Sequence, residues 1–300
     1  MSDDKPTICS NVTAHREAAA MIRSAFIALA VMGLAATAAR AETRTVAYDA
    51  VSLEVSDEGK GPAIVMLPSL GRGSSDFDDL AARLVKAGYR VIRPQPRGIG
   101  ASTGPMTGLT LRSLSDDVAQ VITSSKIGSA IVLGHDDGNR IARATAAYHP
   151  ELVKRVILVG AGGEVLPDAE AAAALKAVFD PALSPQDHLH VVQVAFFAPG
   201  HDPSVWAGGW YPAVAAMERE ANSQTPLQDW WTAGAAQVLV VQGDQDRIAP
   251  PANGDRLKIE IRERATVVHL DGAGHALLPE QPERLAEIIV GYLRQASQGG

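Results

Sequence analysis

Gly134-His135-Asp136-Asp137-Gly138 is the stretch of sequence that decides the fold. The apolar-rich residues 129–133 before it predict a short buried strand, and residues 139–148 after it carry apolar side chains at helical spacing. A strand that turns into a helix within a few residues forms a tight bend, and glycine on both sides of the central residue relieves the crowding there. This is the nucleophile-elbow pattern, with aspartate where serine is commoner, and it places Asp136 at the carboxyl end of a strand.

Apolar strands alternate with helices on both sides of this bend. Strands are predicted at 43–48, 51–55, 63–67, 89–94, 129–133, 152–159, 237–241 and 266–270, the first two as a hairpin, and helices at 76–87, 111–124, 139–148, 253–264 and 282–294. The central strands are apolar on both faces. The pattern therefore predicts an α/β fold with a mainly parallel sheet covered by helices on both sides.

The alternation breaks between residues 164 and 236. Helices are predicted at 169–179 and 185–196, and an aromatic cluster that follows holds all four tryptophans of the chain. We interpret this segment as a helical cap inserted over the carboxyl edge of the sheet. The predicted organisation is an N-terminal extension and signal peptide (1–41), a core (42–163 and 237–300) and a cap (164–236).

Three side chains with complementary chemistry stand at three predicted strand ends: Asp136, Asp246 and His275. In parallel sheets of this kind, ligands bind outside the carboxyl ends of the strands. Nucleophile, acid and histidine in this chain order form the arrangement of a catalytic triad. Asp244 competes with Asp246 for the acid position, and the surrounding motif favours Asp246.

From about Thr43 to the C-terminus, the chain resembles the α/β-hydrolase family with a cap. The motifs that carry the resemblance are the elbow, Arg97-Gly98-Ile99-Gly100-Ala101-Ser102, Gly243-Asp244-Gln245-Asp246 before Pro250, and Gly272-Ala273-Gly274-His275. Aspartate at the elbow is similar to the branch containing epoxide hydrolases and haloalkane dehalogenases. In that branch the aspartate is the nucleophile.

The resemblance implies a two-step reaction. Asp136 attacks an electrophilic carbon and forms an alkyl ester, and His275, oriented by Asp246, activates the water that hydrolyses it. The backbone N–H groups of Leu70 and Asp137 are the expected oxyanion donors. The loop 68–71 reads Pro-Ser-Leu-Gly, where the family usually has His-Gly-x-Pro.

The leaving group requires a further residue from the cap. Tyr211 is the candidate proton donor for an epoxide, and the indole N–H of Trp206 or Trp210 is the candidate donor for a halide. Dehalogenases of this type carry tryptophan at the position of Asp137, and an aspartate there would repel a halide. Epoxide opening is therefore slightly favoured.

Two other functions stay open. In one, Asp136 acts as a base or electrostatic group in an ester, lactone or C–C hydrolase. In the other, the protein binds a small molecule without catalysis.

No cofactor or metal is expected, and the expected partner is a small-molecule substrate. The loop 97–102 lacks the third glycine and the Lys-Ser/Thr pair of nucleotide loops, and the cap histidines His188, His190 and His201 lack a carboxylate at ligand spacing. The net charge of −7 argues against nucleic acid or an anionic membrane as a partner. A hydrophobic content of 46% suits a globular protein with a sizeable core.

The N-terminus has the pattern of a secretory signal peptide. Arg23 precedes an apolar run at 25–36, and Ala39-Arg40-Ala41 fits a cleavage site. Met21 is an alternative start to Met1. The only cysteine, Cys9, lies before the cleavage point, so the mature chain would contain no disulfide or thiolate site.

We predict export to the periplasm or beyond, with cleavage after Ala41 and no stable membrane insertion afterwards, because charge, apolar run and cleavage motif occur in the required order. Intact mass spectrometry of the periplasmic protein should give a chain that begins at Glu42. A mature protein that retains the apolar run would contradict this prediction.

Overall fold

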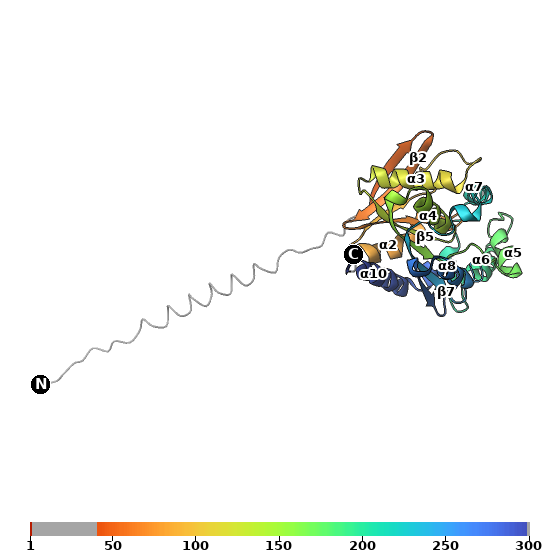
Figure 1. Ribbon diagram of the computed structural model, residues 1–300. Coiled ribbons are helices and arrows are strands. Elements are labelled where there is room, and N and C mark those ends of the chain that lie inside the picture. The colour runs from red at the N-terminus through yellow and green to blue at the C-terminus, as the bar shows by residue number, and fades with distance from the viewer. Residues whose placement is uncertain (2–40, 299–300) are drawn as a thin grey trace. The chain divides into compact units, whose positions relative to one another are not determined.

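One sheet of eight strands organises the part of the chain that the computed structural model describes, Met1 and residues 41–298. The strand order is β1-β2-β4-β3-β5-β6-β7-β8 (Figure 1). β2 pairs antiparallel with both of its neighbours, β1 and β4, and all the other pairs are parallel. Their bounds are β1 Glu42–Tyr48, β2 Val51–Gly59, β3 Ala63–Leu67, β4 Arg90–Pro94, β5 Ala130–His135, β6 Val153–Val159, β7 Gln237–Gly243 and β8 Ala265–Leu270. The predicted hairpin and mainly parallel sheet are confirmed, and β2 runs four residues beyond the predicted end at Val55.

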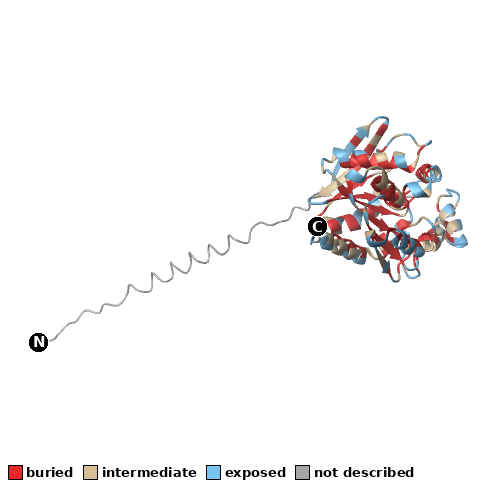
Figure 2. Cartoon of the chain, viewed as in Figure 1, coloured by how far each residue is buried: buried red, intermediate tan, exposed pale blue. Residues whose placement is uncertain are grey.

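Helices cover both faces of this sheet. One face packs against α3 (Leu111–Ser124), α4 (Asp137–Tyr148) and α8 (Ala252–Ile261), and the other against α2 (Asp78–Lys86) and α10 (Pro282–Gln298). The short helix α9 (Leu277–Glu280) precedes α10. β3 and β5 are buried along their whole length, which explains their unbroken apolar sequences (Figure 2).

The segment that we expect to form a cap is helical. It contains α5 (Ala169–Ala177), α6 (Pro185–Phe196), α7 (Pro212–Ser223) and the short 3-10 turns η3 (Pro203–Trp206) and η4 (Leu227–Asp229). α7 is missing from the sequence prediction. Its buried side chains recur at helical spacing, but one of them is the charged Glu218, which obscures the apolar pattern.

The predicted bend between β5 and α4 is tight. Asp136 has φ 51° and ψ −111°, a conformation that costs a non-glycine residue about 1–3 kcal/mol. A Cβ atom on Gly134 would lie 2.1 Å from the Gly138 carbonyl oxygen, and one on Gly138 would lie 2.1 Å from the Leu67 carbonyl oxygen. Glycine is therefore required on both sides of Asp136 so that strand, helix and the end of β3 can approach closely.

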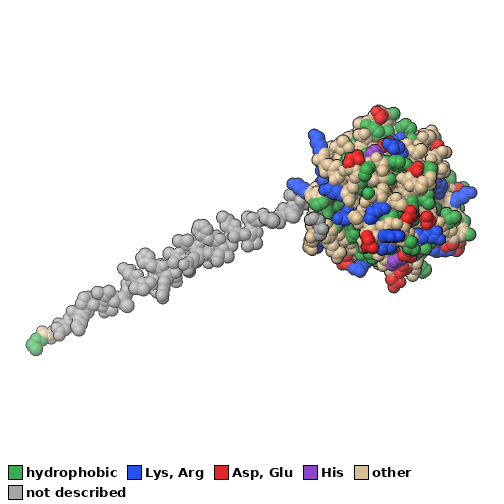
Figure 3. All heavy atoms as spheres, in the orientation of Figure 1, with side chains coloured by type: hydrophobic (Ala, Val, Ile, Leu, Met, Phe, Trp, Pro, Cys, Tyr) green, Lys and Arg blue, Asp and Glu red, His purple; other side chains and the backbone are tan. Residues whose placement is uncertain are grey.

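Basic and acidic side chains are interspersed on the face seen in Figure 3. None of the described helices is long and apolar enough to span a membrane. The predicted signal peptide, Cys9 and the alternative start Met21 lie outside the described residues.

Replacing Gly138 with alanine should lower the melting temperature. The new methyl group would meet backbone atoms that cannot move aside, and such overpacking costs on the order of 1–3 kcal/mol. The matched control is Gly291→Ala in α10, where no heavy atom lies within 4 Å of the new Cβ atom. This control should gain about 0.5–1 kcal/mol, because alanine favours the helix. Equal shifts in calorimetry for the two variants would contradict the close approach at Gly138.

Candidate active site

Asp136, Asp246 and His275 meet at the carboxyl edge of the sheet. His275 Nδ1 lies 2.8 Å from Asp246 Oδ2, and His275 Nε2 lies 3.4 Å from Asp136 Oδ1. Asp136 follows β5, Asp246 follows β7 and His275 follows β8, so the parallel strands deliver all three to one place.

Asp246, and not Asp244, contacts the histidine. Its second oxygen, Oδ1, accepts hydrogen bonds from the N–H groups of Ile248 and Ala249, at 2.9 and 2.7 Å, which fixes the carboxylate. Asp244 instead lies 3.0 Å from His269 on the surface.

The two oxygens of Asp136 have different surroundings. Oδ2 accepts hydrogen bonds from Ser69 Oγ at 2.7 Å and from the Leu70 N–H at 3.1 Å, while Oδ1 faces His275. Leu70 thus lies where we expected an oxyanion donor. Among the described hydrogen bonds to this carboxylate, the second donor is Ser69 and not Asp137. An aspartate carboxylate extends one atom further from the backbone than a serine hydroxyl, so it reaches across to the Ser69 side chain.

Burial and mutual charge shift the pKa values of His275 and Asp136 in opposite directions. Burial alone would lower the pKa of His275, but the carboxylates of Asp246 and Asp136 raise it from 6.5 to about 10. Burial alone would raise the pKa of Asp136, but the hydrogen bond and charge of His275 hold it below its ordinary value. At neutral pH the site therefore holds an imidazolium between two carboxylates.

His135, the residue before Asp136, packs beneath the bend and contacts the backbone of His275. It is fully buried, and its Nε2 lies 2.8 Å from the His275 carbonyl oxygen. Burial and the charge of His275 lower its pKa to about 3, so it stays neutral.

A cavity of about 410 Å³ opens onto Asp136. Asp137 also lines it, and its Oδ1 accepts a 2.5 Å hydrogen bond from Asn222 Nδ2. Burial and the charge of Asp136 raise the pKa of Asp137 to about 6, against the opposing charge of Arg140. Arg140 and Arg219 are the cationic side chains on the cavity wall. Within residues 41–298, no three His, Cys, Asp or Glu side chains are arranged to hold a metal ion.

The three aromatic residues expected in the substrate pocket lie elsewhere. None of Tyr211, Trp206 and Trp210 lines the cavity at Asp136. Tyr211 is 37% exposed, because its extended backbone at the start of α7 takes it out of phase with the buried face of that helix.

The two tryptophans are engaged with other groups. Their rings lie 4.3 and 4.4 Å from the Arg72 guanidinium, and the Trp210 indole N–H donates to the Trp206 carbonyl oxygen at 2.8 Å. They form part of the apolar core of the cap segment, which explains why aromatic residues gather there.

Three polar residues near the site are absent from the sequence prediction: Ser69, Glu218 and Asn222. Ser69 precedes the expected donor Leu70. The sequence signal for its role is that the Asp136 side chain is longer than the serine that is commoner at the elbow. Glu218 and Asn222 lie one turn apart on α7, and recognising that helix from Pro212 at its first turn would have placed them on one face.

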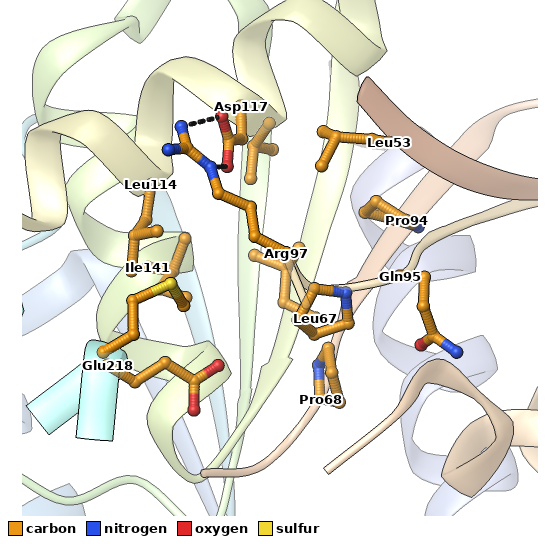
Figure 4. A pocket seen from close by; sticks show the side chains of 13 residues that line it. Leu53, Leu67, Pro68, Pro94, Gln95, Arg97, Leu114, Asp117, Ile141 and Glu218 are labelled. Carbon is orange, nitrogen blue, oxygen red and sulfur yellow. Dashed lines mark hydrogen bonds and ion pairs between the residues drawn. The ribbon is translucent and has the colours of Figure 1, made fainter. Parts of the chain in front are cut away.

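The glycine-rich loop 97–102 has a structural role. Arg97 makes a bidentate ion pair with Asp117 of α3, with Nη2–Oδ1 at 2.6 Å and Nε–Oδ2 at 2.8 Å (Figure 4). These residues line a small separate cavity of about 50 Å³ that includes Glu218 but not Asp136.

Residues 64–288 match the Alpha/beta hydrolase family. The chain is 26% identical over 272 residues to 2-(acetamidomethylene)succinate hydrolase of Mesorhizobium japonicum, covering 84% of this chain and 95% of that protein. It is 31% identical over 113 residues to an epoxide hydrolase of Caballeronia sordidicola, covering 37% and 34%.

Among solved structures, an esterase from Exiguobacterium antarcticum superimposes with a TM-score of 0.69 at 22% identity, covering 83% of this chain and 98% of that one. This likeness concerns the fold alone. The predicted α/β-hydrolase fold is confirmed, whereas the aspartate-nucleophile branch stays a prediction.

Replacing Asp136 with asparagine should lower the pKa of His275, because one of the two carboxylates that stabilise the imidazolium is lost. Side-chain ¹⁵N NMR should show His275 charged at about pH 8 in the unaltered protein, while His135 serves as an internal control that stays neutral at about pH 5. An unchanged His275 pKa in Asp136→Asn would contradict this arrangement.

The raised pKa of His275 also predicts how the stability of the fold changes with pH. The folded-state pKa of His275 lies above 6.5, so its ion pairs stabilise the fold fully below that pH, and this contribution is lost as the pH rises through 10.

Proposed function

Because the chain belongs to the alpha/beta hydrolase family and is a hydrolase, we propose that it cleaves small alkyl electrophiles through a covalent ester on Asp136. One observation carries the proposal: Asp136 Oδ2 is held by Ser69 and Leu70, while Oδ1 lies on the His275 side. A carboxylate with one oxygen fixed by two hydrogen-bond donors and the other held only by the charge of a histidine suits nucleophilic attack.

In the first step, Oδ1 attacks a saturated carbon of the substrate. The new bond joins Oδ1 to that carbon, and the leaving group departs with the electron pair of the broken bond. Oδ2 becomes the carbonyl oxygen of the ester and keeps its two hydrogen-bond donors. These donors are in place before the reaction, so little reorganisation is needed.

Ester formation then converts His275 into a base. Alkylation removes the negative charge of Asp136, and only Asp246 remains to stabilise the imidazolium, so the pKa of His275 falls. His275 then gives up its proton, to the alkoxide of an opened epoxide or, when the leaving group is a halide, to solvent. Apart from its 3.4 Å contact with Asp136 Oδ1, the buried His275 Nε2 has no partner within the described residues, so once that oxygen is alkylated Nε2 can bind a water molecule.

In the second step, His275 takes a proton from water, and the hydroxide attacks the ester carbonyl carbon. The negative charge that develops on Oδ2 is stabilised by Ser69 and Leu70. The intermediate collapses, and the alcohol leaves with the proton from His275. The new carboxyl group of Asp136 then passes its proton to His275, which restores the carboxylate and the imidazolium.

No tyrosine among the described residues lines the cavity at Asp136, where it could protonate a leaving group. Tyr211, on which the preference for an epoxide rested, does not line the cavity, so we propose epoxides and alkyl halides as equal members of the substrate class. Arg140 and Arg219 are the lining groups that can stabilise a departing anion. The N-terminal sequence, which we predict to be an export signal, adds the proposal that the reaction takes place outside the cytoplasm.

Hydrolysis of an ester, lactone or C–C bond, with Asp136 as a base, is the second candidate. The similarity to 2-(acetamidomethylene)succinate hydrolase favours it over the first, because the substrate in that name is neither an epoxide nor an alkyl halide and the similarity spans 84% of the chain, against 37% for the named epoxide hydrolase.

A single turnover in ¹⁸O-labelled water separates the two candidates. The enzyme, in excess, is given epoxides, haloalkanes and short esters in turn. If Asp136 is the nucleophile, the label enters the Asp136 carboxylate and the alcohol of the first turnover is unlabelled. Peptide mass spectrometry locates the label. Label found only in the product, with none in Asp136, would favour the second candidate.

His275→Gln provides an independent check. Ester formation does not need the histidine but ester hydrolysis does, and losing a general base slows a step by about 10²–10⁴-fold. The alkyl-enzyme should therefore accumulate on the peptide that contains Asp136, and Asp136→Ala, which has no nucleophile, should show no adduct.

A further inference from the structure

Helix α7 buries a carboxyl group that the reaction above does not use. Glu218 is 2% exposed, and its side chain extends from α7 toward the loop at Pro68 (Figure 4). Its Oε2 accepts a hydrogen bond of 2.7 Å from the Gly71 N–H. Burying a carboxyl group is costly unless its hydrogen bonds are made, so this contact accounts for its position.

Glu218 binds the loop that carries the donors to Asp136. On the core side, the Pro68 carbonyl oxygen accepts from the Gly138 N–H at 3.0 Å. On the α7 side, the Gly71 N–H donates to Glu218, and the Gly71 carbonyl oxygen accepts from the Tyr211 N–H at 2.8 Å. Both polar groups of Gly71 are thus held by α7.

Leu70 lies between these two anchors. The planar peptide that carries the Gly71 N–H and the planar peptide that carries the Leu70 N–H are joined at the Leu70 Cα atom, so fixing the first restricts the φ and ψ rotations by which the second could turn away from Asp136. Gly71 has φ +61°, and a Cβ atom there would lie 2.6 Å from Phe179, so tight packing restricts the loop on its outer side as well.

We propose that Glu218 is a positioning residue: its hydrogen bond to the Gly71 N–H holds the 68–71 loop so that the Leu70 N–H donates to Asp136 Oδ2. This role rests on the proposed function in one respect, namely that the Leu70 hydrogen bond serves the reacting carboxyl group. Glu218 acts through the loop and does not touch the substrate cavity at Asp136.

Glutamine is the conservative replacement for Glu218, because burial disfavours a charge at this position. Burial, followed by the charges of Asp137 and Asp136, raises the pKa of Glu218 well above its ordinary value, against the opposing effects of the Gly71 hydrogen bond and Arg219. A glutamine side chain lacks the charge that burial disfavours and keeps an oxygen that can accept the Gly71 N–H. Glu218→Gln therefore preserves the contact, whereas Glu218→Ala removes it.

Glu220 supplies a matched control on the same helix. Its Oε1 accepts a 2.9 Å hydrogen bond from the Gly108 N–H, which is also a glutamate–backbone contact but lies outside the 68–71 loop. Glu220→Ala therefore removes the same kind of interaction without affecting the donors to Asp136.

Steady-state kinetics of the three variants test the proposal. Loss of one oxyanion donor costs about 10²–10³-fold in kcat, so a misplaced donor in Glu218→Ala should lower kcat about tenfold or more. KM should stay within about twofold, because the contact is made to the loop and not to the substrate. Glu218→Gln should recover kcat to within about threefold of the unaltered enzyme, and Glu220→Ala should lie in the same range.

Amide hydrogen exchange tests the contact without any turnover. In the unaltered protein the Gly71 amide should exchange slowly, and in Glu218→Ala the Leu70 and Gly71 amides should exchange faster while β5 stays protected. Fast exchange of Gly71 in the unaltered protein, or equal kcat in Glu218→Ala and Glu220→Ala, would overturn the proposal. Normal Gly71 protection together with no ¹⁸O in Asp136 would instead count against the covalent mechanism.

Discussion

The structure depends on the strained bend at Asp136. Three close backbone approaches hold it: β5 against the start of α4 at Gly134, α4 against the end of β3 at Gly138, and the Gly138 N–H on the Pro68 carbonyl oxygen. The positive φ of Asp136 is tolerated because these contacts leave no alternative path for the chain. As a consequence, the carboxylate stands outside the sheet edge, within reach of the loop after β3 and of the histidine after β8.

Once a carboxylate occupies the elbow, the electrostatics of the site differ from those expected for a serine. A serine hydroxyl is neutral and needs a neutral histidine to remove its proton. Asp136 is already ionised, and together with Asp246 it favours a charged His275. The histidine cannot act as a base while both carboxylates are charged. Under the proposed mechanism, formation of the ester on Asp136 removes one of these charges and so allows His275 to act as the base in ester hydrolysis.

Helix α7 joins the cap segment to the reacting group at two points. Glu218 accepts from the Gly71 N–H in the loop after β3, and Asn222, one turn later, donates to the side chain of Asp137, which follows Asp136. Residues four apart on a helix lie on the same side, so a single rigid element can support both flanks of Asp136. The cap segment thus contributes to the geometry of the site through buried polar contacts. Its Trp206 and Trp210 pack in its own core around Arg72, whereas Trp230 and Trp231 pack against the core of the sheet.

The sequence by itself determined the sheet, the covering helices and the meeting of Asp136, Asp246 and His275. These follow from local rules: apolar runs form buried strands, glycine permits a tight bend, and parallel strands end at one edge. Only the tertiary structure decided that Ser69 rather than Asp137 donates to Asp136, that Tyr211 faces away from the cavity, and that Glu218 and Asn222 reach the site. These outcomes depend on the direction of side chains on elements distant in sequence. A buried glutamate or an exposed tyrosine at a helix start has no signature in the local pattern, because its position is set by which partners the fold brings within hydrogen-bond distance.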